Sequence, residues 1–153
     1  MDTPSIALQK LKHFCAYQER CHQEVREKLR QLGLWGDDAE QLIATLVSEN
    51  YLNEERFARG YAGGRFRIKK WGRRKISQAL KMKDVSPYCI RKGLSEIDEE
   101  AYLETLEALA RRKYESLRGE QYLRRRYKTT QYLVSRGYEP ELIARVLESV
   151  AGA

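Results

Sequence analysis

A short pattern of apolar and capping residues occurs three times along the chain, and it constrains the fold more than any other feature. A leucine is followed four residues later by glycine or aspartate, and an isoleucine follows that leucine by ten or fourteen residues. The three occurrences are Leu29, Gly33 and Ile43; Leu80, Asp84 and Ile90; and Leu133, Gly137 and Ile143. The first two positions are typical of a helix end and the third of a core face. The pattern predicts three helical repeats of about fifty residues each.

The remaining apolar residues also follow helical spacing. One stripe is expected to run from Phe57 through Tyr61 and Gly64 to Ile68, which places Ile68 in the core. The neighbouring pair Gly63 and Gly64 is expected to mark a close helix crossing or a bend. The chain has only ten glycines and three prolines, and no stretch alternates long enough to predict a strand. The sequence therefore predicts an all-α fold of three tandem three-helix repeats, stacked into an elongated, curved array.

Capping residues suggest where the helices begin. Asn53 and Asp98 each precede a pair of acidic residues, as N-caps do. Pro87 and Pro140 are expected at the first position of a helix. One unit of this size would bury too little apolar surface alone, so neighbouring repeats are expected to stack. The repeats are expected at residues 1–53, 54–100 and 101–153.

Charge is segregated into blocks. The chain carries a net charge of +7, but residues 65–95 carry +10 and residues 111–136 carry +7. Residues 96–110 carry −6, and residues 1–64 and 137–153 carry −2 each. This segregation favours a polyanion or an acidic protein groove as the binding partner.

The two basic blocks contain the candidate binding residues. Residues 65–75 hold seven cations in eleven positions, with Phe66 and Trp71 between them. Cations interleaved with aromatic rings suit phosphate contact together with base stacking. Trp71 fits equally well as a core residue and as an exposed stacking platform. The residues predicted to bind a partner or nucleic acid are Arg65, Arg67, Lys69, Lys70, Trp71, Arg73, Arg74, Lys75, Arg111, Arg112, Arg124, Arg125, Arg126 and Lys128.

Motifs for catalysis or metal binding are missing from the sequence. The chain has two histidines and no GxSxG, HExxH or P-loop pattern. His13, Cys15, Cys21 and His22 lie close in sequence, but neighbours on a helix diverge and the spacing matches no common zinc motif. The acidic residues between 96 and 107 fit a helix N-terminus with a solvated face. We therefore expect no catalytic residue, no metal and no cofactor, and a protein that is not an enzyme.

The same sequence predicts where the protein resides. No run approaches the ~20 apolar residues that span a bilayer, and no signal-peptide core follows Met1. The three cysteines are odd in number and form no CxxC pair, which disfavours a disulfide framework. We expect a soluble, cytoplasmic protein without a membrane partner, and a monomer, because internal repeats already satisfy much of the need for burial.

Two segments carry the motifs of a known family. The segment Asn50-Tyr-Leu-Asn-Glu-Glu-Arg-Phe-Ala58 is similar to the motif Gly-Tyr-Leu-Asp/Asn-Asp/Glu-x-Arg-Phe-Ala, with asparagine where glycine is usual. The segment from Lys75 to Val85 is similar to the motif Arg/Lys-Ile-x-x-Leu-x-x-Lys-Gly-Ile/Val, with Asp84 in place of glycine. In these motifs, and over about residues 10–150, the chain resembles the RecX regulators, bacterial proteins that restrain the RecA recombinase.

The resemblance implies a regulator rather than a catalyst. RecX proteins are expected to bind the RecA–single-stranded DNA filament, at its end or along its groove, and to touch the DNA directly or through RecA. Inhibition of filament extension, ATPase, recombinase and coprotease activities would follow, within DNA repair, recombination and the SOS response. A free-standing nucleic-acid-binding helical module is the alternative, and a helical scaffold for another acidic partner is a further one.

Overall fold

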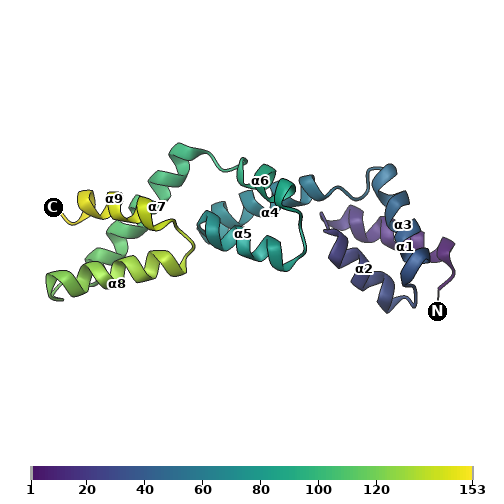
Figure 1. The fold of residues 1–153 in the computed structure, drawn as a ribbon, viewed down its shortest axis with the longest axis horizontal. Coiled ribbons are helices and arrows are strands. Elements are labelled where there is room, and N and C mark those ends of the chain that lie inside the picture. The colour runs from purple at the N-terminus through teal and green to yellow at the C-terminus, as the bar shows by residue number, and fades with distance from the viewer. Residues whose placement is uncertain (1, 153) are drawn as a thin grey trace. The chain divides into compact units, whose positions relative to one another are not determined.

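The structure, a computed structural model, describes residues 2–152 and is all-helical within them (Figure 1). The predicted all-α class and its tandem three-helix repeats are confirmed. The helices of the described residues are α1 (Pro4–Tyr17), α2 (His22–Gln31), α3 (Gly36–Ser48), α4 (Glu54–Lys69), α5 (Arg73–Met82), α6 (Pro87–Leu94), α7 (Glu99–Ser116), α8 (Tyr122–Ser135) and α9 (Pro140–Val150).

The predicted helix starts are confirmed. The Asn53 side-chain oxygen accepts a hydrogen bond from the backbone N–H of Arg56 at 2.9 Å. The Asp98 carboxylate accepts one from the backbone N–H of Ala101 at 3.0 Å. Each bond satisfies an N–H that has no partner within its own helix. Prolines begin α6 and α9, as expected.

The threefold sequence pattern recurs as a threefold structural pattern. Gly33, Asp84 and Gly137 have φ values of +85°, +63° and +100°, so each ends its helix in the left-handed conformation. Aspartate tolerates this conformation better than most residues do. All three leucines and all three isoleucines of the pattern are buried. The pattern therefore marks equivalent positions in the three repeats.

The chain divides into two compact units. The first unit contains the residues up to Tyr61 together with Leu80–Gly93, and the second contains Ala62–Ala79 together with the residues from Leu94 onward. Helix α4 therefore begins in the first unit and ends in the second. The repeat boundaries at 1–53, 54–100 and 101–153 stay a prediction, as does the elongated, curved stacking.

In the first unit, α1, α2 and α3 each pack against the other two (Figure 1). The core between these three helices is apolar and almost fully buried. Elsewhere in the first unit, α6 approaches α4 closely. A Cβ on Gly93 of α6 would lie 2.6 Å from the carbonyl oxygen of Ala58 in α4. The core residues with the least exposure include Ala7, Leu11, Val25, Leu29, Leu46 and Leu52.

Of the two alternatives expected at Gly63 and Gly64, the close helix crossing is wrong, whereas the bend stays a prediction. A Cβ on Gly64 would meet nothing within 4 Å, and the three atoms nearest to a Cβ on Gly63 all belong to the Arg67 side chain of the same helix. The close approach lies at Gly93 instead. A glycine pair within one helix carries no information about which partner helix comes near.

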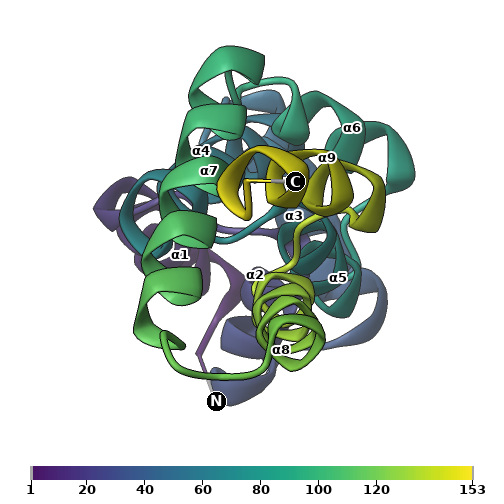
Figure 2. The same ribbon diagram turned by 90° about the vertical axis from the view of Figure 1, so that its left-hand side faces the viewer.

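In the second unit, α7, α8 and α9 each pack against the other two, and this bundle faces the viewer in Figure 2. Three aromatic rings connect the end of α4 to this bundle. The ring centroids of Phe66 and Tyr102 lie 5.7 Å apart, and those of Tyr102 and Tyr138 lie 5.1 Å apart. Tilted contacts of this kind add to the apolar area that the rings bury.

The predicted core position of Ile68 is wrong. Ile68 is 79% exposed, whereas Phe66 is 7% exposed and packs on Tyr102. The buried stripe of α4 passes through Ala58, Ala62 and Phe66 instead. Both stripes obey helical spacing, and the large ring that finds an aromatic partner occupies the core.

No helix in the described part of the chain is long and apolar enough to cross a membrane.

Candidate functional site

The loop between α4 and α5 lies at the centre of the first basic block, residues 65–75, and the turn between α8 and α9 holds its backbone. The N–H of Gly72 donates to the carbonyl of Arg136 at 2.8 Å. The N–H of Arg74 donates to the carbonyl of Gly137 at 2.9 Å. These two bonds pair segments more than sixty residues apart and leave neither N–H without a partner.

Two side chains from the same turn hold the preceding carbonyls of the loop. The Tyr138 hydroxyl donates to the carbonyl of Lys70 at 2.9 Å, and the Arg136 guanidinium donates to the carbonyl of Lys69. Lys70 has a φ of +59°, an uncommon conformation for a residue other than glycine. The four bonds fix the path of the loop, so the basic side chains project from a defined backbone.

Glycine is required at two positions of this contact. A Cβ on Gly72 would lie 2.3 Å from the carbonyl carbon of Gly137. A Cβ on Gly137 would lie 2.4 Å from that of Lys75, and Gly137 also has the left-handed φ. The two backbones therefore touch without intervening side chains, which explains the glycine in the basic block.

Trp71 lies half-buried between two cations. The guanidinium carbon of Arg65 is 5.7 Å from the Trp71 ring centroid, and the Lys75 ammonium is 4.7 Å from it. Cations at these distances are attracted by the ring face. The ring is neither fully in the core nor fully exposed, so it combines parts of both roles predicted for it.

Four cations of the first block are exposed to solvent. These are Arg67, Lys69, Lys70 and Arg74. Phe66, which the sequence placed between these cations as a stacking ring, is buried instead. The exposed cations and the accessible part of Trp71 therefore form the surface that a partner can reach; we call these five residues the basic loop surface.

Arg73 differs from its neighbours because its guanidinium is used inside the second unit. It pairs with Glu139 at 2.9 Å and with Glu99, and its guanidinium carbon stacks 3.8 Å from the Tyr102 ring centroid. Burial by itself would lower the pKa of Arg73, but the hydrogen bond to Glu139 and the charges of Glu139, Tyr102 and Glu99 together outweigh it and raise the pKa. Arg73 thus connects the first basic block to α7 and to the start of α9.

The hydroxyl of Tyr102 completes this network. It accepts a hydrogen bond from the backbone N–H of Arg73 at 2.9 Å and donates one to Glu139. Burial and the hydrogen bond to Glu139 both raise the pKa of Tyr102, so the hydroxyl remains protonated over the physiological range. The network is fully satisfied and holds the first turn of α5 in place.

In the second basic block, residues 111–128, several cations have acidic partners close in sequence. Arg111 pairs with Glu107 at 2.8 Å, one turn earlier on α7. Lys128 pairs with Glu120, which lies just before α8. Exposed pairs of this kind contribute ~0–1 kcal/mol each, but they partly neutralise the charge offered to a partner.

The arginines at the start of α8 have different surroundings. The Nε of Arg125 donates to the carbonyl of Tyr114 at 2.8 Å, and its guanidinium carbon lies 3.7 Å from the Tyr114 ring centroid. Arg126 donates to the hydroxyl of Tyr122 at 3.3 Å, and Arg124 is exposed. Arg125 is therefore a packing residue of the second unit, whereas Arg124 is available to a partner.

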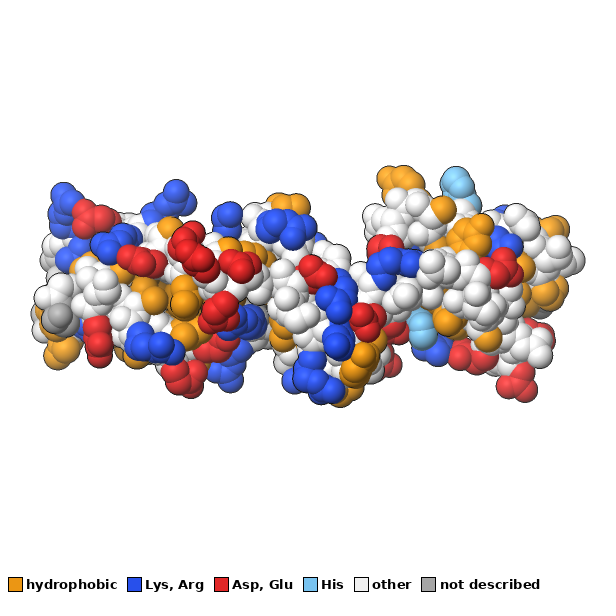
Figure 3. Space-filling view, turned by 90° about the horizontal axis from the view of Figure 1, so that it is seen from above, with side chains coloured by type: hydrophobic (Ala, Val, Ile, Leu, Met, Phe, Trp, Pro, Cys, Tyr) orange, Lys and Arg blue, Asp and Glu red, His pale blue; other side chains and the backbone are white. Residues whose placement is uncertain are grey.

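The two basic blocks meet at a small cavity of about 290 Å³. Lys70 from the first block and Arg112 from the second line it together with Glu104 and parts of α7. Figure 3 shows acidic side chains gathered over the first half of α7, mixed with lysines and arginines. The predicted basic residues are thus brought into one unit, but they do not form a single uninterrupted positive face.

The groups that support the basic loop surface were not identified from the sequence. Tyr102, Arg136, Tyr138 and Glu139 position it, although none belongs to a basic run. A usable signal was present in the third repeat, where Tyr138 directly follows the left-handed glycine of the threefold pattern. The equivalent residue of the second repeat, Val85, has no hydroxyl to donate.

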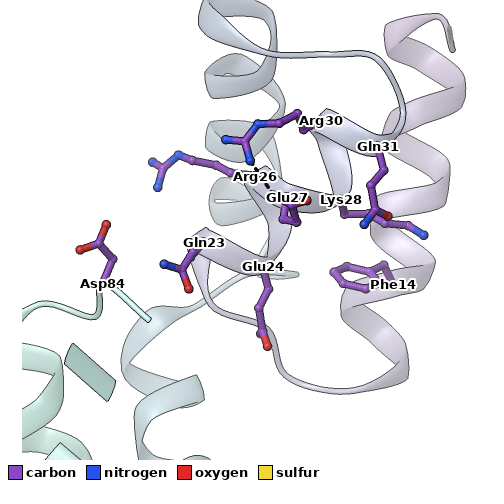
Figure 4. Close-up of a pocket in the computed structure, with 9 residues that line it drawn as sticks. All are labelled: Phe14, Gln23, Glu24, Arg26, Glu27, Lys28, Arg30, Gln31 and Asp84. Atoms are coloured by element: carbon purple, nitrogen blue, oxygen red, sulfur yellow. Dashed lines mark hydrogen bonds and ion pairs between the residues drawn. The ribbon is translucent and has the colours of Figure 1, made fainter. Parts of the chain in front are cut away.

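The first unit contains a larger cavity of about 700 Å³ beside α2 (Figure 4). Asp84 lies across this cavity from the α2 side chains. Two of the three cations that line the cavity are already paired: Arg26 binds Glu40 through two bonds of 2.9 Å, and Arg30 binds Glu27. The hydrogen bonds to Glu40 raise the pKa of Arg26. The lining is balanced in charge, since Arg26, Lys28 and Arg30 stand against Glu24, Glu27 and Asp84.

The cysteines and histidines near the N-terminus do not come together. Within residues 2–152, no group of three or more potential metal-binding side chains converges. His22 Nδ1 lies 3.1 Å from a carboxylate oxygen of Glu54, and burial lowers the pKa of His22. Cys21 is fully buried, which raises the pKa of its thiol to about 11.

Two family models match consecutive parts of the chain. A model of the second three-helix domain of RecX matches residues 53–94, and a model of its third three-helix domain matches residues 99–147. The first matched range contains α4, α5 and α6, and the second contains α7, α8 and most of α9. Both basic blocks lie within them.

Several relatives share the sequence over longer stretches. The regulatory protein RecX of Prosthecochloris aestuarii is 31% identical over 144 residues, which cover 94% of this chain and 93% of that protein. RecX of Clostridium perfringens strain 13 is 35% identical over 124 residues, and RecX of Lactobacillus johnsonii is 34% identical over 103 residues. These last two matches cover 78% and 67% of this chain but only 57% and 38% of the relatives.

Solved structures show the same fold. The crystal structure of RecX from Lactobacillus salivarius superposes with a TM-score of 0.90 at 20% sequence identity, covering 98% of this chain and 97% of that one. A second crystal structure of a regulatory protein RecX superposes with a TM-score of 0.85, also at 20% identity, covering 98% of this chain and 72% of the other. At this identity the likeness concerns the fold alone.

Proposed function

The chain belongs to the RecX family, and from that premise we propose that it regulates the RecA recombinase by binding the filament that RecA forms on single-stranded DNA. Binding inhibits filament extension and, with it, the ATPase, recombinase and coprotease activities of RecA. The chain performs no covalent chemistry in this role. It acts in the cytoplasm as a monomer, where it competes for the surface of the growing filament.

The basic loop surface is the observation that carries this function. Its backbone is held by four hydrogen bonds from the α8–α9 turn, and Arg67, Lys69, Lys70 and Arg74 are exposed on it. A fixed loop loses less conformational entropy on binding than a flexible one, so more of its electrostatic attraction is expressed as affinity. Arg112 and Arg124 extend the contact from the second block.

Several cations must act together, because one exposed ion pair contributes only ~0–1 kcal/mol. The informative variant removes three exposed charges of the basic loop surface: Arg67→Gln, Lys69→Gln and Arg74→Gln. Arg73 is left in place, because its guanidinium holds Glu99, Glu139 and Tyr102. The matched control also removes three exposed charges, through Lys81→Gln, Arg91→Gln and Arg145→Gln.

The test is a time course of RecA ATP hydrolysis on single-stranded DNA with increasing amounts of this protein. The wild-type chain slows hydrolysis, and the control variant does so at similar concentrations. The loop variant needs about tenfold more protein, since three weak contacts of about 0.5 kcal/mol together correspond to that factor. Equal inhibition by both variants removes the role of the loop, and a wild-type chain without effect removes the regulatory function.

Direct nucleic-acid binding without RecA is the second candidate, and Trp71 between Arg65 and Lys75 favours it. A ring flanked by cations suits a base and its phosphates. Titration of the protein against single-stranded DNA, with and without RecA and at two salt concentrations, separates the two functions. Tight binding without RecA that falls steeply with salt indicates the free-standing module. Weak DNA binding beside inhibition at protein amounts below those of RecA indicates the regulator.

A further inference from the structure

A shallow cavity of about 560 Å³ lies on the first unit, away from both basic blocks in sequence. It is formed by one face of α1, by Arg20 in the chain that leads into α2, and by Lys28 of α2. None of its lining residues carries a carboxylate. The aromatic and basic residues that line it are Lys10, His13, Phe14, Tyr17, Arg20 and Lys28.

Two cations are held against the ring of Phe14. The Arg20 guanidinium carbon lies 3.7 Å from the ring centroid, and the Lys28 ammonium lies 5.5 Å from it. The Nε of Arg20 also donates to the carbonyl of Phe14 at 3.0 Å. Arg20 is therefore positioned before any ligand arrives, with donors of its guanidinium left over.

Tyr17 is the most accessible ring of this cavity. It is 78% exposed and lies one turn after Phe14 on the same face of α1. Its ring centroid is 6.0 Å from the Arg20 guanidinium carbon. The ring offers a surface on which a base can stack, and the guanidinium beside it can donate hydrogen bonds to a phosphate. The two groups are close enough to bind the base and the phosphate of neighbouring positions on one strand.

The carboxylates near this cavity are occupied by other cations. Glu19 pairs with Arg56, Glu27 pairs with Arg30, and Glu24 lies 3.5 Å from Lys83. At the rim, Lys10 pairs with Asp2 at 2.9 Å. Arg20 and Lys28 instead face an aromatic ring, so their charges are available to an anion.

We infer that this cavity is a second nucleotide-binding site, which takes a base and an adjacent phosphate of a single DNA strand. The base stacks on Tyr17, and the phosphate is bound by Arg20 and Lys28. The net charge of −2 over residues 1–64 conceals the site in the sequence. The inference rests on the proposed function only in sharing single-stranded DNA as the ligand, and it requires no RecA.

Photochemical cross-linking locates the site directly. The full-length protein is irradiated with a short oligodeoxythymidylate that carries 5-iodouracil, and the cross-linked peptides are identified by mass spectrometry. Cross-links to Tyr17 or Phe14 are expected, in addition to those at Trp71. Cross-links confined to the second unit overturn the inference.

A binding measurement tests the contribution of the ring. In the background of Arg67→Gln, Lys69→Gln and Arg74→Gln, which weakens the basic loop surface, Tyr17→Ser is expected to weaken oligonucleotide binding about tenfold, the effect of losing one stacked base. Trp35→Ser is the matched control, because Trp35 is 66% exposed in the same unit and does not line the cavity. Equal affinities of the two variants overturn the inference.

Competing ligands identify the chemistry that is recognised. Oligodeoxythymidylate and oligouridylate are both expected to displace the labelled strand, whereas inorganic phosphate alone is expected to fail because it has no base to stack. Polyglutamate is the competitor that tests for an acidic protein partner. If polyglutamate displaces the labelled strand, and does so equally well from the Tyr17→Ser variant, the site binds an acidic protein and the inference is overturned. Inhibition of RecA without cross-links in α1 removes only this second site. Cross-links at Tyr17 without inhibition remove only the regulatory function.

Discussion

The backbone of Gly72 lies against the backbone of Gly137, so closely that a Cβ on Gly72 would be 2.3 Å from the carbonyl carbon of Gly137. This contact joins the loop between α4 and α5 to the turn between α8 and α9. The two residues are far apart in sequence, yet the basic loop surface depends on their approach. The function proposed for the loop therefore has a structural requirement that lies in the third repeat.

Substitution of Gly72→Ala is expected to destabilise the second unit by about 1–3 kcal/mol, the usual cost of forcing extra atoms into a packed contact. The backbone must shift to admit the Cβ, and the bonds from Arg136 and Tyr138 then weaken. Denaturant unfolding followed by circular dichroism measures the change in midpoint.

Gly60→Ala is the matched control, since a Cβ on Gly60 of α4 would meet nothing within 4 Å. Alanine favours the helix over glycine by about 0.5–1 kcal/mol, so this variant is expected to be more stable than the wild-type chain. Equal midpoints for the two variants would show that the Gly72 contact is absent in solution.

Tyr102→Phe is expected to cost about 1–3 kcal/mol, because the change leaves the backbone N–H of Arg73 and a carboxylate oxygen of Glu139 without their partner. Tyr17→Phe removes an exposed hydroxyl instead and is expected to change stability by less than about 0.5 kcal/mol. Urea titration compares the two. A Tyr102→Phe variant as stable as Tyr17→Phe would mean that the network contributes no net stability.

The stability of the first unit is expected to fall as pH decreases below 6.5, the ordinary pKa of histidine. Burial lowers the pKa of His22, and Arg26 lowers it further, so the folded chain binds this proton less readily than the unfolded chain. The stability that the neutral His22 side chain contributes is present above pH 6.5 and is lost as the pH falls through the lowered pKa. His22→Gln is expected to flatten this dependence, measured as unfolding midpoints between neutral pH and about pH 5.

Two variants separate His22 from its surroundings. His13→Gln removes the exposed histidine of α1 and serves as the control for the loss of a histidine. Burial raises the pKa of Glu54, so Glu54 changes the stability with pH in the opposite direction from His22. The stability that it contributes is present below pH 4.5 and is lost as the pH rises through the raised pKa. A wild-type slope retained in His22→Gln would assign the acid sensitivity to another group.

Single-stranded DNA is expected to quench the fluorescence of Trp71. Trp35→Phe leaves Trp71 as the sole tryptophan, since the chain has two. A base that stacks on the accessible part of the ring between Arg65 and Lys75 quenches its emission. In the converse variant, Trp71→Phe, only Trp35 emits, and its fluorescence is expected to stay unchanged when single-stranded DNA is added. Oligonucleotide binding without quenching of Trp71 would restrict this ring to a packing role.

Local features of the fold were predictable because each is encoded within a few residues. The N-caps are made by the side chains of Asn53 and Asp98, which bind a backbone N–H only three residues later. The left-handed helix ends depend on the backbone of Gly33 and Gly137 themselves. Ile68 was misplaced because helical spacing allows more than one stripe on α4. Only the position of Tyr102, supplied by a later helix, decides that Phe66 is buried instead.

The candidate site was predictable in composition but not in detail. A run of seven cations is visible in the sequence, whereas the use of Arg73 by Glu99 and Glu139 depends on side chains 26 and 66 residues away. Arg125 is likewise unavailable to a partner, because it donates a hydrogen bond to the carbonyl of Tyr114, 11 residues earlier. The N-terminal cavity was concealed for the opposite reason, since the acidic residues around it dominate the local charge while pairing with other cations.

The hydrogen bonds that Arg136 and Tyr138 make to Lys69 and Lys70 set the order in which the protein can mature. During synthesis, the basic segment leaves the ribosome well before its partners have been translated. Until then the carbonyls of Lys69 and Lys70 lack these two partners. The last third of the polypeptide thus supplies the side chains that hold the basic segment, and a truncated translation product would retain its charge without those two hydrogen bonds.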